Sequence, residues 1–368
     1  MAAISLEGVR RVHADGTVAL HDIDLAIQDG HLFTIVGPSG SGKSTLLRSI
    51  AGLDPLTSGV VRINGRDMAG TLPRDRDLAL VAQQSSLYGF LDVAGQLAFP
   101  LEIRKTEPAE VERRVTAERR AFRLGAIWRR RPKQLSAGDA QRTAIARAMV
   151  RLPRALLLDE PLQLLDPPTQ ARLRNELYRL HRASGLTMVY TTNDHGQVLG
   201  IADRLAVLRD GRIAQVDTPQ EILNRPVDRW VAGFVGEPAM SFIDAVVEEQ
   251  GGLGWLAVGD QRLRFPGGLP GPLRQRVGGR VTLGGRPDKI RAVEPADPVD
   301  QQLDGIAHGV QRLGNHDQVA VAFPTGQWIA RFPSKLMSQA GDKVAISVAV
   351  RGLSYFDASS GRAIWHGE

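Results

Sequence analysis

Short apolar runs alternate with longer amphipathic segments over the first 225 residues or so. Four apolar runs have the length and β-branched character of buried strands: Leu32–Val36, Leu78–Ala82, Ala155–Leu158 and Thr187–Tyr190. Three segments have helical periodicity and are rich in helix-forming residues: Thr45–Gly52, Asp139–Arg151 and Pro168–Ser184. This alternation predicts an α/β fold built on a mostly parallel sheet.

The strand pattern is interrupted between Gln84 and Arg151. Charged residues become frequent there, as in Glu107–Arg123, and no strand-like run is visible. We therefore expect an all-helical insert within the α/β domain. Its run Arg129–Arg131 is compatible with nucleic-acid binding, but a solvated helical or loop face is the favoured interpretation.

The pattern of apolar and turn-forming residues changes again after Glu237. Short apolar segments are separated by Gly, Pro, Asp and Asn: Gly254–Val258, Arg280–Leu283, Val319–Phe323, Trp328–Phe332 and Val344–Val350. Regular short strands with turn residues between them predict a small β barrel or sandwich. We thus expect two domains, residues 1–236 and residues 237–368. Trp255, Trp328 and Trp365 are interpreted as packing or barrel-rim residues rather than as a sugar platform.

Composition narrows the possible chemistry. The 368 residues are 43% hydrophobic and 23% charged, as in ordinary globular proteins, and no run approaches the roughly 20 apolar residues of a spanning helix. The N-terminus reaches Glu7 before any long apolar stretch, so no signal peptide is expected. The absence of cysteine excludes disulfides, thiolate metal sites and cysteine nucleophiles. The net charge of +6 by itself indicates neither a membrane nor a nucleic-acid partner.

A phosphate-binding loop follows the first central strand. Residues 37–45 read Gly-Pro-Ser-Gly-Ser-Gly-Lys-Ser-Thr and match G-x-x-x-x-G-K-[ST] between a strand and a helix. Glycines let backbone N–H groups curl around phosphate oxygens, and the helix N-terminus adds partial positive charge. Lys43 is expected to reach the β- and γ-phosphates, and the Ser44 hydroxyl to bind Mg²⁺.

A second acidic element supports this interpretation. The apolar run Ala155–Leu158 ends in Asp159 and Glu160. Such a pair on its own can be a solvated turn. Together with the upstream loop it predicts a Mg²⁺ site in which Asp159 holds the ion and Glu160 acts as general base on the attacking water.

The order of these and later motifs resembles the nucleotide-binding subunit of an ABC transporter. The resemblance rests on the phosphate loop, Gln83, Leu135–Asp139, Leu158–Pro161, Leu165–Asp166 and Thr192–Asp194. Flanking segments such as Gly37–Gly52 and Ala202–Val216 are similar to the sugar, glycerol-3-phosphate and glycerol importer ATPases. That group carries a C-terminal OB-like regulatory barrel, and Gly284–Pro287 and Leu353–Arg362 fall where its motifs fall. The resemblance covers essentially the whole chain.

The resemblance implies an assembly and a set of contacts. Two ATPase subunits would pair head to tail on two transmembrane permease subunits, peripherally at the cytoplasmic face of the membrane, with an extracytoplasmic solute-binding protein and no nucleic acid. The segment Gln83–Phe99 would form the permease-docking groove. ATP contacts would come from His13, Gly37, Pro38, Ser39, Gly40, Ser41, Gly42, Lys43, Ser44, Thr45, Gln83, Ser136, Gly138, Asp139 and Asp166. Mg²⁺ would be held by Ser44, Gln83 and Asp159, and the catalytic residues would be Glu160, Gln83 and Asn193.

The chain departs from the family pattern at four positions in these motifs. His13 stands where an adenine-stacking aromatic is usual, Ala137 and Asp139 alter the signature loop, and Asn193 replaces the usual switch histidine. Asp139 places a carboxylate near a polyanion, where like charges repel. His195 lies two residues further on and is interpreted as a surface or capping histidine. Ser136 is also expected to cap the helix that follows it.

Two interpretations of function remain open at this point. The intact Lys43, Ser44 and Glu160 favour an importer ATPase, with a sugar or polyol as expected solute and polyamine or metal-complex uptake as alternatives. The changes at positions 137, 139 and 193 favour a weakly hydrolysing subunit of a heteromeric importer. A soluble ABC protein acting in DNA repair or translation is disfavoured by the long β domain.

Overall fold

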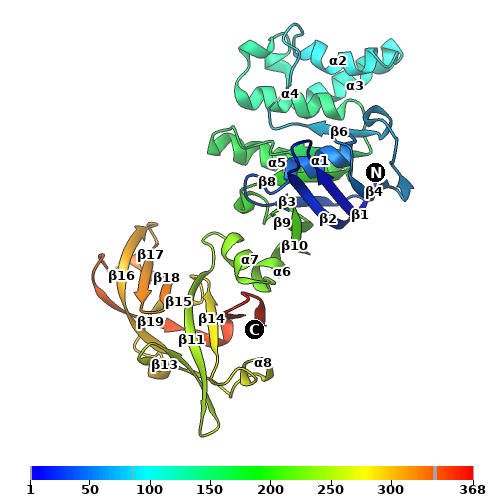
Figure 1. Cartoon of the computed structure of the whole chain (residues 1–368). Helices are drawn as coiled ribbons and strands as arrows, with labels where there is room; N and C mark the ends of the chain where they lie inside the picture. Colours follow the sequence, from blue (N-terminus) through cyan, green and yellow to red (C-terminus); the bar gives the residue numbers. More distant parts are fainter. Residues whose placement is uncertain (1, 85, 335–337, 368) are drawn as a thin grey trace. The chain divides into compact units, whose positions relative to one another are not determined.

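The computed structural model describes residues 2–84, 86–334 and 338–367 and divides into two units, Met1–Pro219 and Gln220–Glu368 (Figure 1). No helix in the described ranges is both long and apolar enough to cross a membrane. Each unit has a core of its own, and each is described by itself below.

A six-stranded sheet forms the centre of the first unit. Its strands follow the order β10-β9-β3-β8-β7-β6, and all except β10 run parallel to their neighbours. Their bounds are β3 Leu32–Val36, β6 Leu78–Val81, β7 Ala155–Asp159, β8 Thr187–Thr192, β9 Arg204–Arg209 and β10 Arg212–Asp217. Every residue of β3, β7 and β8 is buried, as expected for parallel strands covered on both faces. The predicted α/β fold is confirmed.

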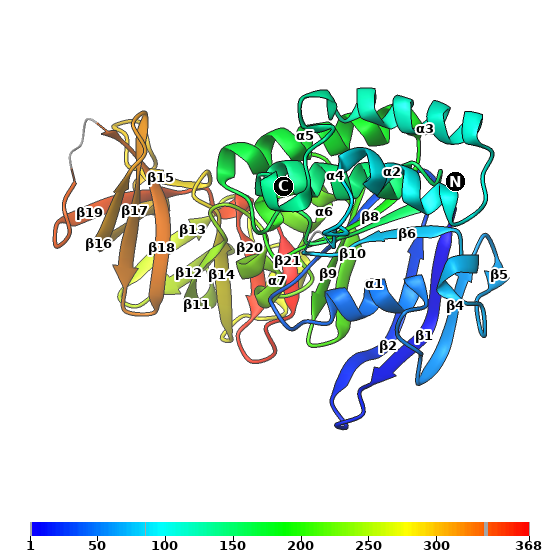
Figure 2. The same ribbon diagram turned by 90° about the horizontal axis from the view of Figure 1, so that it is seen from above.

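A second, antiparallel sheet accompanies the first. It has the order β2-β1-β4-β5, with β1 Ile4–Val12, β2 Val18–Ile27, β4 Ser58–Ile63 and β5 Arg66–Asp67. The helix α1, Lys43–Ala51, contributes Leu46, Leu47 and Ile50 to the core that joins both sheets. Figure 2 shows this antiparallel sheet and the helices α2 to α5 on opposite sides of the unit. The helix α1 is thereby held by the core that the two sheets share.

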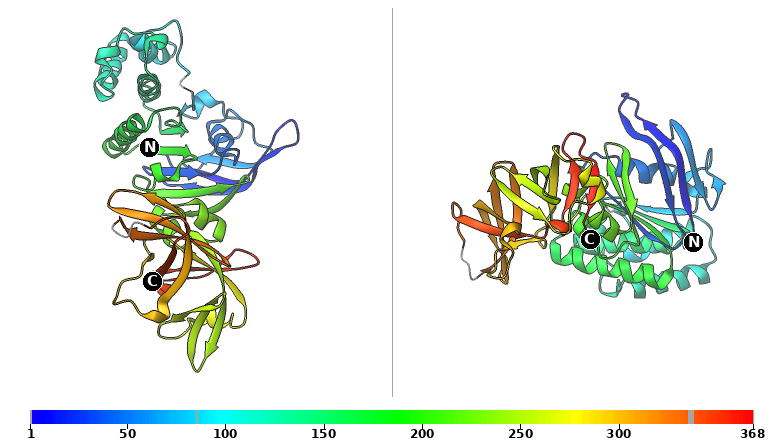
Figure 3. Two further views of the ribbon diagram at one scale, coloured as in Figure 1. Left: turned by 90° about the vertical axis from the view of Figure 1, so that its left-hand side faces the viewer. Right: turned by 90° about the horizontal axis from the view of Figure 1, so that it is seen from below.

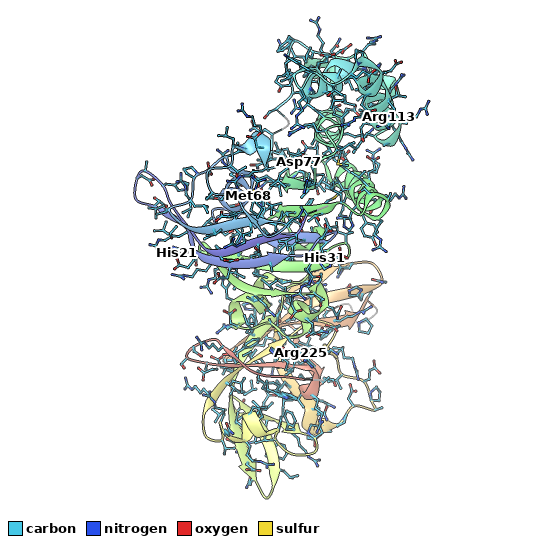
Figure 4. All side chains as sticks on the ribbon, turned by 90° about the vertical axis from the view of Figure 1, so that its right-hand side faces the viewer. His21, His31, Met68, Asp77, Arg113 and Arg225 are labelled. Atoms are coloured by element: carbon cyan, nitrogen blue, oxygen red, sulfur yellow. The ribbon has the colours of Figure 1, made fainter. Side chains whose placement is uncertain are left out.

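The insert between the strands β6 and β7 is helical, as predicted. In the described part of residues 84–151 the regular elements are α2 Val93–Glu102, α3 Pro108–Ala121, α4 Ala137–Met149 and short 3-10 turns. Val115 is the one buried residue of the helix α3, and the Arg113 side chain is 65% exposed at the outer edge of the insert (Figure 4). The helix α5, Pro167–Ser184, returns the chain to β8.

The second unit is a curved β structure. Eleven strands form one sheet, and the parallel pairing of β15 with β18 links distant strands of that sheet. Their bounds are β11 Ser241–Gln250, β12 Leu253–Val258, β13 Gln261–Phe265, β14 Arg280–Gly285, β15 Ile290–Ala292, β16 Gln302–Arg312, β17 His316–Phe323, β18 Gly326–Pro333, β19 Lys343–Val348, β20 Ser354–Asp357 and β21 Ala363–His366. The strands curl around a common interior (Figure 3), and the predicted β barrel is confirmed.

Two of the three tryptophans expected to pack in or at the rim of the barrel contact its core. Trp328 is fully buried in the barrel core, and Trp365 packs against that core from its edge. Trp255 is half-buried on β12, where it pairs with Glu248 and Arg264 across the sheet. The short helix α8, Gly271–Arg274, also contributes a buried leucine.

The division between the units falls earlier than the predicted boundary at residues 236 and 237. The difference concerns α6, Pro219–Asn224, and α7, Arg229–Phe234. The half-buried Arg286 guanidinium donates hydrogen bonds to the Leu223 carbonyl at 2.9 Å and to the Val235 carbonyl at 3.0 Å. These bonds tie the segment that holds both helices to the β unit. That an independently folding domain ends at residue 236 stays a prediction.

Candidate functional site

The loop between β3 and α1 has a backbone that only glycine accommodates at its critical points. Gly42 has φ 101°, and a Cβ there would lie 2.6 Å from the Ala19 carbonyl oxygen. A Cβ on Gly37 would lie 2.3 Å from the Leu208 carbonyl oxygen. Gly42 caps α1 without a side-chain hydrogen bond, so no side chain there satisfies the first N–H groups of the helix. A loop of this kind is suited to bind an anion.

Lys43 is held inside this loop. Its ammonium donates to the carbonyl oxygens of Gly37 and Pro38, both at 2.9 Å, and lies 3.1 Å from Glu160 Oε1. The Lys43 side chain is 3% exposed and that of Glu160 is 10% exposed. The three protons of the ammonium therefore have partners within the protein, and a phosphate must replace one of them to be bound.

Asp159 lies at the end of β7 between two hydroxyl groups. Ser44 Oγ donates to Asp159 Oδ1 at 2.9 Å, and Thr191 Oγ1 donates to the same oxygen at 2.8 Å. Thr191 is fully buried on β8, directly opposite Asp159 in the sheet register. The sequence reasoning missed Thr191. Its signal was a hydroxyl residue in an apolar strand, which becomes informative only when the register of β7 and β8 is known.

The same oxygen ligands fit a magnesium ion bound together with a triphosphate. Mg²⁺ prefers oxygen ligands and in such sites takes one or two from the protein, the remainder coming from phosphates and water. Ser44 and Asp159 provide one hydroxyl and one carboxylate at this place. The described residues contain no cluster of three or more His, Cys, Asp or Glu that would bind a metal ion alone. The buried Ser41 hydroxyl also lacks a hydrogen-bond partner among them, as expected beside an anion-binding loop.

Glu160 has an unusual backbone conformation. Its φ of 44° lies in the left-handed region that residues other than glycine seldom adopt. Its N–H group donates to both the carbonyl and the hydroxyl oxygen of Thr191, each at 3.1 Å, which holds this conformation in place. Strained residues of this kind are concentrated at functional sites.

A cavity of about 450 Å³ lies beside Lys43, Ser44 and Glu160. It is lined by His13, Thr17, Val18, Ala19, Ser39, Gly40, Gly42, Lys43, Ser44, Thr45, Gln83, Glu160 and Gln163. Gly37, Pro38 and Ser41 belong to the same loop without lining the cavity. His13 is half-buried in the turn after β1, where its N–H group donates to the Thr17 carbonyl at 2.8 Å. The structure thus places His13 and Gln83 together with the phosphate loop.

Gln163 is a second residue that the sequence reasoning missed. The Gln83 side-chain amide donates to the Gln163 side-chain carbonyl, and both residues line the cavity. The Gln163 N–H group donates to the Glu160 carbonyl at 3.3 Å, so Gln163 belongs to the turn that also positions Glu160. With its N–H₂ group engaged in this way, Gln83 keeps its carbonyl oxygen available for a cation.

The remaining predicted site residues do not line this cavity. Ser136 caps α4 as predicted, because its hydroxyl accepts from the Asp139 N–H group at 3.1 Å. Gly138 is buried, and a Cβ on it would lie 2.7 Å from the Thr169 methyl carbon. Asp166 caps α5 by accepting from the Thr169 N–H group at 3.0 Å, and hydrogen bonds from Thr169 lower the pKa of Asp166.

Asn193 follows β8 and is half-buried. The adjacent turn is held by Asp194, whose carboxylate accepts from the Gln197 side-chain amide at 2.9 Å. His195 is the first residue of the 3-10 turn η4, His195–Gln197. None of Ser136, Gly138, Asp139, Asp166 and Asn193 is among the residues that line the cavity.

Comparisons with known proteins agree with this geometry. Residues 20–163 match the ABC transporter family. The chain is 37% identical over 366 residues to the sn-glycerol-3-phosphate import ATP-binding protein UgpC 1 of Rhizobium johnstonii, covering 99% of this chain and 96% of that protein. It is 38% identical over 374 residues to the UgpC protein of Cereibacter sphaeroides, covering 99% and 100% of the two chains.

Solved structures resemble the first part of the chain. The ATP-binding cassette MJ0796, a dimer bound to ADP and Pi in a post-hydrolysis state, matches with a TM-score of 0.54 and 30% identity, covering 59% of this chain and 98% of that one. The structure of cbiO1 from Clostridium perfringens, part of the ABC transporter complex cbiONQ, matches with a TM-score of 0.57 and 26% identity, covering 60% of this chain and 90% of that one.

The fold, the loop around Lys43 and the carboxylates at the end of β7 define an ATPase with a phosphate-binding loop. The chain belongs to the ABC transporter family, among the ATP-binding proteins of importers. The resemblance stated from the motifs is thereby confirmed, and so are the use of ATP and the ATPase activity that it implied.

Proposed function

We propose that this chain uses Mg·ATP to drive uptake of a small polar solute through two permease subunits. The single observation that carries the proposal is the arrangement of Lys43, Ser44 and Glu160 around one cavity next to a loop shaped for phosphate, with Asp159 bonded to Ser44. The similarity to importer ATP-binding proteins over nearly the whole chain supports the transport role.

The chain's own residues would act in sequence. Backbone N–H groups of residues 39–45 and the Lys43 ammonium would bind the phosphates, and this exchange would release Glu160 from its ion pair. Ser44 and Asp159 would hold Mg²⁺ and Gln83 would offer its free carbonyl oxygen to it. When bound, the ion neutralises charge on the β- and γ-phosphates. Glu160 would then orient a water molecule and accept its proton.

A second ATPase subunit would complete the site. Ser136, Gly138, Asp139 and Asp166 lie at the beginnings of α4 and α5, away from the cavity that holds Lys43. This location supports contact with ATP bound to another subunit, as does the dimeric state of the similar MJ0796 structure. Asn193 would contribute from the same side as the phosphate loop. The second subunit would be a copy of this chain or a different ATPase.

The permease subunits would dock on the helical insert. A second cavity of about 450 Å³ lies among α2, α4, β6 and the segment that leads to α2, and includes Ser86, Tyr88 and Phe99. Four arginines line it, Arg74, Arg104, Arg147 and Arg151, whereas no acidic side chain is among its lining residues in the described part of the chain. Burial lowers the pKa of Arg147 and of Arg151. An apolar helix with acidic groups would complement this groove.

This docking would hold the subunit peripherally at the cytoplasmic face of the membrane, with a solute-binding protein on the other side. We expect the solute to be a sugar or polyol. Glycerol 3-phosphate is the first candidate because the similar importer proteins are named for it. Uptake of labelled glycerol 3-phosphate by cells with and without this chain tests that choice directly.

A second candidate function is a weakly hydrolysing subunit of a heteromeric importer. The observation that favours it is the signature loop, where the Asp139 carboxylate accepts a hydrogen bond from Ser136 at 2.8 Å. Asn193 also lacks the imidazole that the family usually has there. In such a complex a partner ATPase would perform most of the hydrolysis.

One set of variants tests these proposals on the full-length chain. Calorimetry should detect Mg·ATP binding that is lost in Lys43→Ala and retained in Lys133→Ala, a matched change at an exposed lysine. Hydrolysis should be lost in Glu160→Gln while binding persists. Absence of Mg·ATP binding in the unmodified chain would refute the proposed function. Equal turnover of the assembled importer with and without Glu160→Gln would establish the second candidate.

A further inference from the structure

The signature serine is already bonded within its own chain. Ser136 Oγ donates to Asp139 Oδ2 at 2.8 Å and accepts from the Asp139 N–H group at 3.1 Å. The single proton of the hydroxyl is therefore used by a carboxylate three residues away. No donor is left on this side chain for another anion until that bond breaks.

The carboxylate is held in place by a connected set of charges. Arg142 Nη2 lies 3.7 Å from Asp139 Oδ1, and Arg142 Nε lies 3.6 Å from Glu176 Oε2 on α5. The three side chains are 24%, 27% and 33% exposed, in the order Asp139, Arg142, Glu176. Because Arg142 is shared with Glu176, it neutralises only part of the charge on Asp139. The beginning of α4 therefore keeps a negative charge of its own.

This charge lies where a helix otherwise attracts anions. The N-terminus of a helix carries partial positive charge and free N–H groups, which favour a phosphate or a carboxylate. Here Asp139 in the first turn of α4 supplies the carboxylate. An arriving phosphate thus meets a position that is already occupied by like charge.

We propose that Asp139 is a positioning residue that keeps the Ser136 hydroxyl bonded inside its own chain and opposes closure of this surface over ATP. The inference rests on the proposed function, which brings Ser136 to the ATP of a second subunit. Closure requires Ser136 to exchange Asp139 for the γ-phosphate and requires the two negative groups to approach. Association of two subunits therefore requires a higher Mg·ATP concentration than it would with a neutral residue at position 139.

A structural role of Asp139 predicts a different result. If the carboxylate only stabilises the start of α4, its removal lowers thermal stability and leaves ATP-dependent association unchanged. Asp139→Asn distinguishes the two roles, because the amide keeps the shape of the side chain and can still accept from Ser136. Asp139→Glu keeps the charge.

The experiment measures self-association of the full-length chain by sedimentation velocity as Mg·ATP is increased, with Glu160→Gln present throughout to prevent hydrolysis. We expect Asp139→Asn to lower the Mg·ATP concentration at half-maximal association by about three- to tenfold at low salt. Asp139→Glu should show no such decrease. The matched control is Glu112→Gln, which removes one negative charge from an exposed position on α3 and should change nothing.

Ionic strength supplies the second readout. Repulsion between Asp139 and phosphate is screened by salt, so the difference between Asp139→Asn and the parent should shrink between about 0.05 M and about 0.5 M salt. Equal midpoints for the two proteins, a difference independent of salt, or no association of either protein at any ATP concentration would overturn the inference. Loss of Mg·ATP binding in the parent chain itself would instead refute the proposed function.

Discussion

The Lys43 ammonium lies 3.1 Å from the Oε1 atom of Glu160, and neither side chain is more than one-tenth exposed. The residue expected to bind phosphate and the residue expected to activate water therefore form an ion pair with each other. In the proposed mechanism the phosphates of ATP replace Glu160 beside Lys43, so nucleotide binding and release of the base are one event. We expect this coupling to keep Glu160 from acting as a base before phosphate has bound.

The first prediction concerns this ion pair. Glu160→Gln should lower the rate of ATP hydrolysis by about 10²–10³-fold, because the base is lost. Mg·ATP should bind more tightly than to the unmodified chain, because Lys43 no longer has to leave a carboxylate. Single-turnover hydrolysis and calorimetric binding measure the two effects separately. Weaker binding of Mg·ATP by this variant would contradict the role given to the ion pair.

Thr191 provides a second prediction. Its hydroxyl donates to Asp159 at 2.8 Å and accepts from the Glu160 backbone N–H group, so it holds the Asp159 carboxylate and the backbone of Glu160. Thr191→Val should raise the Mg²⁺ concentration for half-maximal ATPase activity by about tenfold, as is typical when a partner of a metal ligand is lost. Thr191→Ser keeps the hydroxyl and should restore the normal Mg²⁺ requirement. An unchanged Mg²⁺ dependence in Thr191→Val would show that Asp159 needs no such support.

A third prediction tests the contact between Gln83 and Gln163. Gln163→Leu removes the carbonyl that accepts from the Gln83 amide and leaves a side chain of similar size. We expect kcat to fall several-fold with little change in KM for ATP, because Gln83 is expected to act on Mg²⁺ and water rather than on ATP affinity. Gln163→Glu keeps an acceptor and should preserve kcat. A rise in KM alone would place Gln163 in ATP binding instead.

Glu118 on α3 predicts a dependence of stability on pH. Burial raises the pKa of Glu118 to about 7, and its Oε2 atom has no hydrogen-bond partner among the described residues. The folded state therefore binds this proton more tightly than the unfolded state. The resulting contribution to the unfolding free energy is complete below about pH 4.5 and is lost as pH rises through about 7. Glu118→Gln removes this loss. Because the side chain is only partly buried, solvent screens it, and we expect the gain in unfolding free energy to be about 1–2 kcal/mol at pH 8.5.

Thermal unfolding of both proteins at acidic and alkaline pH checks this expectation. The two melting temperatures should be close at pH 5 and should separate at pH 8.5, with the variant higher. The exposed residue Glu112 offers a matched control, because Glu112→Gln should leave the melting temperature unchanged at both pH values. A constant difference at all pH values would assign the effect of Glu118→Gln to packing instead of ionisation.

Local sequence predicted most of the central fold and the phosphate loop. The loop is a contiguous segment whose glycines, lysine and hydroxyl each have a fixed place, and the strand Leu32–Val36 has the bounds that its apolar run indicates. The cap of α4 by Ser136 was likewise visible, because an N-cap depends on residues three apart.

Contacts between distant segments could not be predicted from local sequence. Thr191 meets Asp159 only because β7 and β8 are neighbours in a definite register, which the chain order does not specify. Gln163 was overlooked because its importance depends on its reach to Gln83 across the cavity. In the second unit the apolar runs indicated strands, but the pairing of β15 with β18 depends on the curvature of the whole sheet.

Gly138 has a consequence for movement of the molecule. Because a Cβ at this position would lie 2.7 Å from the Thr169 methyl carbon, the first turns of α4 and α5 touch with no room for a side chain between them. We therefore expect a displacement of one of these turns to displace the other. Ser136 and Asp166, one at the head of each helix, should shift as a single rigid edge whenever a neighbouring subunit presses against either of them.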